Sequence, residues 1–333
     1  MPPFQKTLGT YMKISVVIAS FNGASFIREQ LVSIAAQSIP PHEIVVSDDG
    51  SSDETGSIVA EFSAQNPHIS VKFSVNPSSL GVDKNFEHAI SLASGDVIFL
   101  CDQDDVWLHD RVETMLLPFQ KFSTPVATFC DSRIVDEKLH DLGYSHLQSR
   151  GFPSLQEIFD GNCNCFLKRV PPAGHDMAFA AELKEVLLPF PDLKDCYDTW
   201  IGLVLFALGA WKFSSPIPLT LFRRHRASVT RSGLVPSFKE LFLQAKKAVD
   251  EDYSAWYAEL YRVLIERVKD RVSPEMLAFL EARRLHSLAR SSMNTAFPER
   301  LKKVYQETRN GNYFRFGRSY LNIIQDLFFR KPR

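Results

Sequence analysis

Apolar runs of strand length alternate with segments of helical spacing through the first hundred residues, and this alternation limits the folds open to the chain. Residues 97–101 are apolar throughout, which is typical of a strand buried on both faces. Strands that alternate with helices predict a parallel sheet with right-handed crossovers and helices on both faces, and therefore an α/β fold. We predict strands at 14–19, 43–47, 69–74 and 97–101, and helices at 24–37, 53–65 and 82–93.

Polar loops follow three of these predicted strands. Asn22 follows the first strand, Asp48 and Asp49 follow the second, and residues 102–105, Asp-Gln-Asp-Asp, follow the fourth. The carboxyl ends of parallel strands lie on one edge of a sheet, where such folds bind ligands. Carboxylates crowded there repel one another unless a cation or protons neutralise them, and oxygen ligands favour Mg²⁺ or Mn²⁺. We therefore predict a divalent metal in a ligand crevice, although the acidic cluster alone is equally compatible with a solvated loop that caps the next helix.

Composition narrows the classes of function. The chain has 333 residues, of which 45% are hydrophobic and 23% charged, as in ordinary globular proteins. A formal net charge of −1 and an isoelectric point near 6.8 argue against nucleic acid as a partner. The five cysteines include no Cys-x-x-Cys pair, and no apolar run approaches the ~20 residues that cross a bilayer. We expect reduced thiols and a cytoplasmic protein.

The pattern divides the chain into three regions. Residues 1–12 are predicted to form an N-terminal arm, residues 13–235 an α/β domain, and residues 236–333 a C-terminal helical region. The second half of the domain is less regular than the first. Its predicted strands are at 126–130, 177–181 and 218–222, with loop and short helix over 140–172 and a helix over 199–208.

Three segments together resemble one family of enzymes. They are residues 16–22 (Val-Val-Ile-Ala-Ser-Phe-Asn), 45–53 (Val-Val-Ser-Asp-Asp-Gly-Ser-Ser-Asp) and 102–107 (Asp-Gln-Asp-Asp-Val-Trp). In this order and spacing they resemble the family 2 glycosyltransferases of the GT-A fold, and the third segment most resembles the bacterial rhamnosyltransferase-like branch. The resemblance covers about residues 13–235. It implies a mostly parallel central sheet with flanking helices, and an inverting transfer of a sugar from a nucleotide-diphosphate donor, dTDP-rhamnose being the donor that the branch favours.

The resemblance also implies a donor site. By motif position, Asp48 or Asp49 would contact the nucleobase, with Asn22 nearby. Lys84 and Asn85 fall where the family contacts the donor. An acidic side chain at a strand end suits this role, because a carboxylate accepts hydrogen bonds from base N–H groups and ribose hydroxyls.

The metal-binding residues implied by the resemblance come from two segments. Asp102 and Asp104 match the carboxylates of the D-x-D motif, which bind metal and ribose. Residues 221–229 resemble the branch's Tyr-Arg-x-His segment. There His225 would complete the metal coordination, and Arg223 and Arg224 would hold the donor diphosphate bidentately.

The acceptor hydroxyl needs a general base within about 3 Å. The family places that base in a late acidic motif, which Asp198 occupies here, although Tyr197 replaces the branch's histidine. Asp198 is our predicted base, with Asp195 as the second candidate and a helix-capping role as the structural alternative. His175 and Trp200 are predicted to lie on the acceptor side, and for Trp200 core packing is equally compatible with the sequence.

The last segment, residues 313–333, interleaves aromatic with basic residues. An amphipathic helix of this composition can lie on an anionic leaflet, or it can pack on the domain with its basic face in solvent. The resemblance implies a saccharide acceptor that is lipid-linked, in O-antigen or capsule biosynthesis. Peripheral attachment at the inner face of the cytoplasmic membrane is therefore a hypothesis that the sequence supports.

Two other classes of function remain open. A sugar-phosphate nucleotidyltransferase also needs a metal and a parallel sheet, but it would need a Gly-rich, basic loop after the first strand, and residues 20–25 contain one glycine and no basic residue. A non-catalytic scaffold that binds nucleotide sugars would not need the carboxylates at 102, 104 and 198. Glycoside hydrolysis by two carboxylates is more distant, because it needs neither a metal nor a nucleotide crevice.

Overall fold

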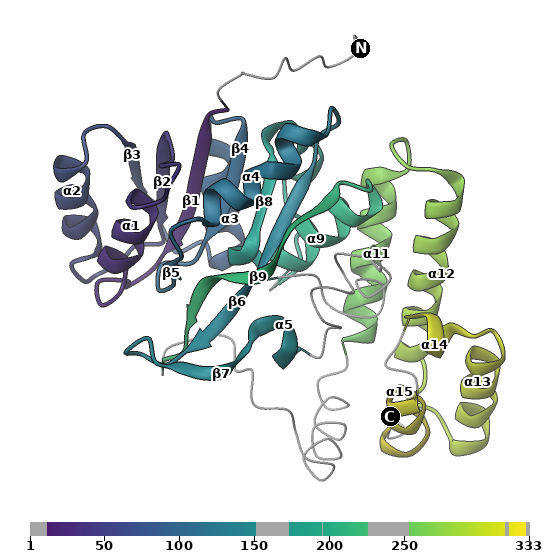
Figure 1. Ribbon diagram of the computed structural model, residues 1–333. Coiled ribbons are helices and arrows are strands. Elements are labelled where there is room, and N and C mark those ends of the chain that lie inside the picture. The colour runs from purple at the N-terminus through teal and green to yellow at the C-terminus, as the bar shows by residue number, and fades with distance from the viewer. Residues whose placement is uncertain (1–11, 151–172, 195, 226–252, 317–319, 331–333) are drawn as a thin grey trace. The chain divides into compact units, whose positions relative to one another are not determined.

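The computed structural model describes residues 12–150, 173–194, 196–225, 253–316 and 320–330 (Figure 1). By their contacts the residues divide into two units, one of residues 1–161 and 171–232 and the other of residues 162–170 and 233–333. Residues 1–11 of the predicted arm and the predicted boundary after residue 235 lie outside the described residues.

Four parallel strands form one half of the sheet in the first unit, in the order β3-β2-β1-β4 (Figure 1). Val17 of β1 faces Val45 of β2 on one side and Leu100 of β4 on the other. β1, β2 and β4 are buried along nearly their whole length, which explains their unbroken apolar sequences, whereas the edge strand β3 is largely exposed. The bounds confirm the predicted strands: β1 Ile14–Ser20, β2 Glu43–Asp48, β3 Ser70–Val75 and β4 Val97–Cys101.

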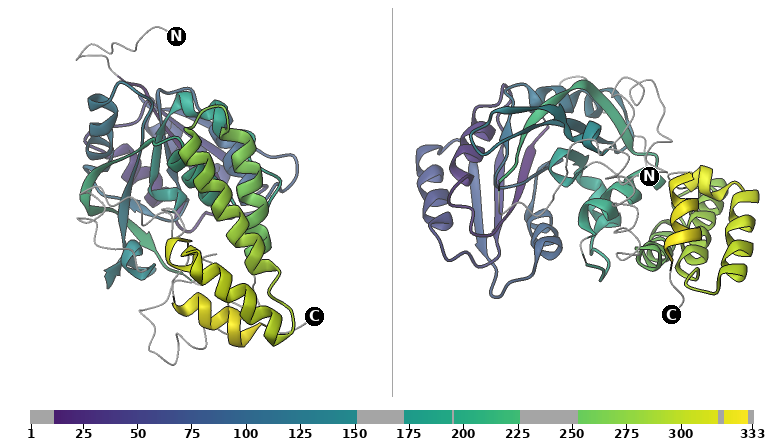
Figure 2. Two further views of the ribbon diagram at one scale, coloured as in Figure 1. Left: turned by 90° about the vertical axis from the view of Figure 1, so that its right-hand side faces the viewer. Right: turned by 90° about the horizontal axis from the view of Figure 1, so that it is seen from below.

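The helices that connect these strands lie on opposite faces of the sheet (Figure 2). Helices α1 (Ile27–Ala35) and α2 (Thr55–Gln65) join strands that step in one direction, and α3 (Val82–Leu92) returns across the sheet to β4. Because parallel crossovers are right-handed, this reversal places α3 on the other face, where it packs on β1 and β2. The strand order reverses between β1 and β4, which is where α/β sheets bind ligands.

The other half of the sheet is mixed. β8 is antiparallel to both β4 and β6, while β6 and β9 are parallel to each other. The three predicted strands are present, and two of them extend further than predicted. The bounds are β5 Val106–Trp107, β6 Ala127–Val135, β7 Asp141–Ser145, β8 Met177–Ala180 and β9 Trp211–Arg223; the helical elements are α4 Arg111–Lys121, α5 His146–Ser149, η1 Gly174–Asp176, η2 Ala181–Leu183, α8 Lys184–Leu187 and α9 Tyr197–Ala207.

The pairing of β5 with β9 brings two distant segments together. Val106 faces Leu221 and Trp107 faces Thr220 in an antiparallel register. The end of β9 therefore lies against the acidic loop after β4, and His225, two residues after β9, reaches the same rim.

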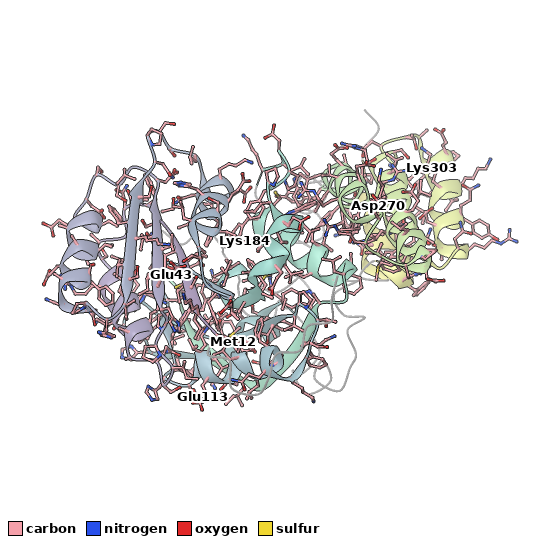
Figure 3. All side chains as sticks on the ribbon, turned by 90° about the horizontal axis from the view of Figure 1, so that it is seen from above. Met12, Glu43, Glu113, Lys184, Asp270 and Lys303 are labelled. Atoms are coloured by element: carbon pink, nitrogen blue, oxygen red, sulfur yellow. The ribbon has the colours of Figure 1, made fainter. Side chains whose placement is uncertain are left out.

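The amino-terminal edge of the parallel strands carries a structural carboxylate, Glu43, which is labelled in Figure 3. Burial alone would raise the pKa of Glu43, but hydrogen bonds from Lys72, Ser15 and Ser94 lower it to about 2. The ion pair of Glu43 with Lys72, 2.7 Å long, fixes the start of β2. The predicted ligand-binding residues lie at the opposite edge of the sheet.

The second unit is helical in its described part. Tyr313 and Phe316 are buried, and the Tyr313 hydroxyl donates a hydrogen bond to the buried Asp326 at 2.8 Å. The described residues of 313–333 are helical up to Phe316 and again from Tyr320 to Phe329, and the prediction of one amphipathic helix depends on residues 317–319, which lie outside the described part. No helix in the described part of the chain is long and apolar enough to cross a membrane. The bounds are α11 Ser254–Val268, α12 Pro274–Ser291, α13 Phe297–Arg309, α14 Asn312–Phe316, α15 Tyr320–Ile324 and a π-helical turn η3 Gln325–Phe329.

Candidate functional site

Gln103 joins the loops that follow β1 and β4. Its side-chain amide accepts a hydrogen bond from the Phe21 backbone N–H at 3.0 Å and donates one to the Phe21 carbonyl at 3.1 Å. A Cβ at Gly23 would lie 2.3 Å from Oε1 of Gln103, so glycine permits this approach. The sequence motifs give no role to Gln103. Its contacts hold the flanking Asp102 and Asp104 at the rim of the switch point.

Asp48 and Asn22 fix the loop that follows β2. The buried Asp48 carboxylate accepts hydrogen bonds from the Ser20 hydroxyl at 2.7 Å, the Ser51 backbone N–H at 2.7 Å and the Ser51 hydroxyl at 2.6 Å. The Asn22 backbone donates to the Ser51 hydroxyl at 2.7 Å, and its side chain accepts from the Ser52 backbone N–H at 2.9 Å. These predicted donor residues therefore shape the rim, and their contact with a nucleobase stays a prediction.

Asp49 organises the loop that precedes α3. It accepts hydrogen bonds from the Ser79 hydroxyl at 2.7 Å and from the backbone N–H groups of Leu80 at 2.6 Å and Gly81 at 3.0 Å, together with one from Asn76. Burial raises the pKa of Asp49, but these hydrogen bonds outweigh it and the pKa is lowered. The carboxylate is thus held ionised at the end of β2.

Asn85 and Lys84 lie in the first turn of α3. Asn85 is buried, donates to the Ser20 carbonyl at 3.2 Å and accepts from the Asn76 amide at 3.0 Å. The Lys84 ammonium lies 2.9 Å from Glu87, and its side chain is 41% exposed. Asn85 supports the rim from inside, whereas Lys84 is accessible to a donor.

Asp102, Asp104 and His225 are the three residues predicted to bind metal. The side chains of Asp102 and Asp104 are 30% and 18% exposed, and Nε2 of His225 lies 2.7 Å from Oδ2 of Asp104. Burial and the negative charge of Asp102 raise the pKa of Asp104. A divalent cation relieves such repulsion, and carboxylates with an imidazole suit Mn²⁺ or Mg²⁺. The chemistry of these three donors suits the predicted metal, whereas the rim residues whose ligand atoms lie within 4.8 Å of one another are Asp102, Asp105 and His175.

An open cavity of about 600 Å³ adjoins the Asp104–His225 pair. That volume is within the range of small-molecule sites. The Arg224 guanidinium lies 5.0 Å from the centre of the Phe222 ring, and Arg224 stays a candidate for the diphosphate. The cavity is lined by Asp136, Glu137, Lys138, His140, Arg224 and His225.

Arg223 holds the acidic loop instead of facing a ligand. It is 3% exposed; its Nε donates to the Asp104 carbonyl at 2.9 Å and its Nη1 to the Glu137 carbonyl at 2.6 Å. Its Nη2 binds the Glu29 carboxylate, and its backbone N–H donates to Asp105 at 3.2 Å. The predicted contact with the diphosphate is corrected, because all three guanidinium nitrogens are engaged within the protein.

We expect Arg223→Ala to lower the free energy of unfolding by about 2–4 kcal/mol, because two carbonyls and a carboxylate lose their donor. Denaturant unfolding followed by circular dichroism measures this. Arg133→Ala is the matched control: Arg133 pairs with Asp141 where both side chains are nearly half exposed, so its loss should cost less than about 1 kcal/mol. Equal losses in the two variants would contradict the role of Arg223.

Asp198, the predicted base, lies in the first turn of α9. Its Oδ1 accepts from the Thr199 backbone N–H at 2.6 Å, and no hydrogen bond to its Oδ2 is found among the described residues. The first amides of the helix, those of Cys196 and Tyr197, donate to Asp83 at 3.1 Å each. Asp83, which our sequence analysis did not identify, therefore provides the cap. Burial raises the pKa of Asp198.

The two predicted acceptor-side residues are buried. Trp200 has no exposed surface and donates its ring N–H to the Leu187 carbonyl at 2.8 Å, so it is a core residue. His175 is 3% exposed and lies 3.3 Å from Asp102 and 3.4 Å from Asp176. Burial lowers the pKa of His175, but the carboxylates around it raise the pKa to about 10. Both predictions are corrected, because neither side chain has a surface for an acceptor.

The family model described as "Glycosyl transferase family 2" matches residues 15–166. These residues are a family 2 glycosyltransferase domain. The match includes the rim loops of this glycosyltransferase domain with Asp48, Asp49, Asp102 and Asp104, which carry the resemblance in the sequence.

Known relatives of the glycosyltransferase domain match parts of the chain. An uncharacterized glycosyltransferase of Nostoc sp. is 30% identical over 190 residues, 55% of this chain and 55% of that protein. The dTDP-rhamnosyl transferase RfbG of Shigella flexneri is 38% identical over 30% of this chain and 35% of its own length. The chain thus spans about half, or less, of these curated relatives. A crystal structure of residues 1–349 of S. aureus TarS has a TM-score of 0.56 at 18% identity, covering 95% of this chain and 81% of that chain, and this likeness confirms the predicted GT-A fold.

Proposed function

We propose that the protein is a metal-dependent, inverting glycosyltransferase that moves a sugar from a nucleoside-diphosphate donor to a saccharide hydroxyl. The observation that carries this proposal is the pairing of Asp104 with His225 at 2.7 Å, on the same loop as Asp102 at the switch point of the sheet. These three side chains would hold a divalent metal. A metal bound there would neutralise the charge that develops on the departing diphosphate.

Asp198 is the general base of this proposal. The acceptor hydroxyl must lose its proton as it attacks, and the Oδ2 atom of Asp198 makes no hydrogen bond within the described part of the chain. A raised pKa makes this carboxylate a stronger base than an ordinary aspartate. A single displacement at the anomeric carbon inverts its configuration. Asp195, the second candidate, lies outside the described residues.

The raised pKa of Asp198 predicts a loss of activity in acid. Only the ionised carboxylate accepts a proton, so kcat falls as the pH falls through this pKa. Because burial raises the pKa above its ordinary 3.8, the loss begins at a higher pH than an exposed aspartate would give. Measuring kcat against pH in the wild type and in Asp198→Asn checks this. An acid limb of the same midpoint in the variant would assign the titration to another group.

The donor that we propose is dTDP-rhamnose. The Asp-Gln-Asp-Asp-Val-Trp segment and the name of the Shigella relative both support it. Among the described residues, Lys84 and Arg224 are our candidates for the diphosphate, and Asp48 and Asp49 remain our candidates for the nucleobase. The cavity beside His225 has room for a hexose.

The acceptor that we propose is a lipid-linked saccharide of a bacterial surface polysaccharide, such as O-antigen or capsule, at the inner face of the cytoplasmic membrane. Peripheral contact through residues 313–333 stays part of this proposal. Its described exposed apolar residues are Phe314, Ile324 and Phe328, with exposed fractions of 40%, 41% and 66%. Among the described residues of this segment, these three side chains are the exposed apolar ones available for the contact, since Tyr313 and Phe316 are buried.

A transfer assay tests the function. The full chain is incubated with dTDP-rhamnose or UDP- and GDP-sugars and with lipid-linked saccharides, in Mn²⁺, Mg²⁺ or EDTA. Release of nucleoside diphosphate that requires both acceptor and metal is the expected result. No release from any pairing would contradict an enzymatic function, and equal release in EDTA would contradict the metal dependence.

A further inference from the structure

His175 lies beneath the rim among three carboxylates. Its Nδ1 is 3.3 Å from Oδ2 of Asp102, and its Nε2 is 3.4 Å from Oδ2 of Asp176 and 3.9 Å from Oδ2 of Asp105. The hydroxyl of Ser132, 3.3 Å from Nε2, is itself hydrogen-bonded to Asp176. Ionised carboxylate oxygens offer no proton, so the ion pair with Asp102 requires the proton to be on Nδ1 of His175.

Within the described residues, His175 is the one side chain that makes a hydrogen bond or ion pair with the Asp102 carboxylate. The remaining oxygen of Asp102 therefore has its direction set by this contact. Asp104, in contrast, faces His225. The two acidic residues of the motif are thus restrained by different imidazoles, one below the rim and one beside it.

His175 is itself rigidly held. Its carbonyl accepts a hydrogen bond from the buried Arg111 guanidinium at 2.5 Å, and its ring stacks on Phe222 with a centroid distance of 4.7 Å and an interplanar angle of 16°. The preceding residue, Gly174, lies so close to Tyr197 that a Cβ would be 2.4 Å from that ring. A side chain fixed in this way transmits a defined orientation to the group that it contacts.

We propose that His175 is a positioning residue, which orients Asp102 for binding a metal–nucleoside diphosphate at the rim. The inference rests on the proposed function and adds a residue that the motifs do not assign to the metal site. Removing a side chain that contacts and orients a metal-binding residue, without binding the metal itself, lowers metal affinity by about 10–100-fold. The expected signature is therefore a loss of metal-dependent nucleotide affinity.

His146 provides a matched control. It is as buried as His175, stacks beside it at a centroid distance of 5.6 Å, and also contacts Phe222, at 5.1 Å. Its Nδ1 lies 3.7 Å from Asp176, and no contact with Asp102 is found among the described residues. Replacing His146 removes an imidazole from the same cluster and leaves the restraint on Asp102 in place.

The test is calorimetric titration of dTDP and UDP, in Mn²⁺ and in EDTA, into the full-length wild type and His175→Ala, His175→Asn and His146→Ala. Thermal unfolding checks that each variant is folded. We expect His175→Ala to weaken binding in Mn²⁺ by about 10–100-fold. His175→Asn should recover part of the affinity, because the asparagine amide places an N–H near the position of Nδ1. His146→Ala should lower the unfolding temperature and leave the affinity within about twofold of the wild type.

Two outcomes would overturn the inference. In the first, His175→Ala binds the nucleotide in Mn²⁺ with wild-type affinity. In the second, His146→Ala weakens binding as much as His175→Ala does, so that loss of core packing explains both. If His175→Ala does not fold, the comparison of His175→Asn with His146→Asn decides in the same way. A wild type that binds neither nucleotide in Mn²⁺ would instead contradict the proposed function, and the inference would fall with it.

Discussion

Asp198→Asn is expected to lower kcat by ~10²–10⁴-fold, the usual range for the loss of a general base. The amide cannot take the proton of the acceptor hydroxyl. It retains an oxygen for the Thr199 backbone N–H, now 2.6 Å from Oδ1, and Asp83 still caps α9, so the local fold is kept. Donor affinity should be unchanged, because Asp198 lies outside the rim loops. Release of nucleoside diphosphate gives kcat, and calorimetry gives the donor Kd.

Asp192→Asn is the matched control for this experiment. Asp192 is exposed and precedes α9 in the same acidic segment, so its substitution should leave kcat unchanged. Full activity in Asp198→Asn would show that another group is the base. A loss of donor affinity as large as the loss of kcat would assign Asp198 to binding.

Asp104→Asn is expected to abolish most of the metal-dependent nucleotide affinity, a loss of at least about 10–100-fold. The variant removes a negative charge from the proposed donor set and weakens the contact with His225, which is 2.7 Å long in the wild type. Nucleotide affinity in EDTA should change little, because the substitution affects only the part of binding that runs through the metal. The Kd for a nucleoside diphosphate in Mn²⁺ and in EDTA measures both parts.

Asp136→Asn is the matched control for Asp104→Asn, because it removes a carboxylate charge at a different position near His225. Asp136 lines the same cavity, and its Oδ1 accepts hydrogen bonds from the Lys138 and His140 backbone, which an asparagine oxygen can also accept. Its affinity in Mn²⁺ should stay within about twofold of the wild type. A full metal response in Asp104→Asn would remove Asp104 from the proposed donor set.

The parallel half of the fold could be predicted because its evidence is local in the sequence. Strands β1, β2 and β4 are buried on both faces, so each appears as an unbroken apolar run, and each is followed directly by its polar loop. Topology then places those loops on one edge without further information. The closeness of Asp104 to His225 agrees with the family resemblance, since the two come from distant segments.

The roles of Arg223, His175 and Trp200 could not be predicted, because burial in the mixed half depends on long-range pairing. The β5–β9 pairing turns Arg223 back onto the acidic loop, which no local pattern shows. Trp200 belongs to helix α9, whose residues 199–205 are all buried. Its place in the motif of the predicted base Asp198 had indicated the acceptor site instead. In the C-terminal unit, the buried Asp326 draws the Tyr313 hydroxyl inward, which a helical-spacing argument does not anticipate.

The most direct test of the central claim is the unfolding temperature of the wild type with dTDP, UDP and GDP, each in Mn²⁺, Mg²⁺ and EDTA. A ligand that binds only the folded state stabilises it, and the stabilisation grows with the logarithm of the ligand concentration divided by its Kd. The rim of Asp102, Asp104 and His225 predicts that one nucleoside diphosphate raises the unfolding temperature in the presence of metal and not in EDTA. No shift with any nucleotide, or the same shift in EDTA, would contradict a metal-dependent donor site at this rim.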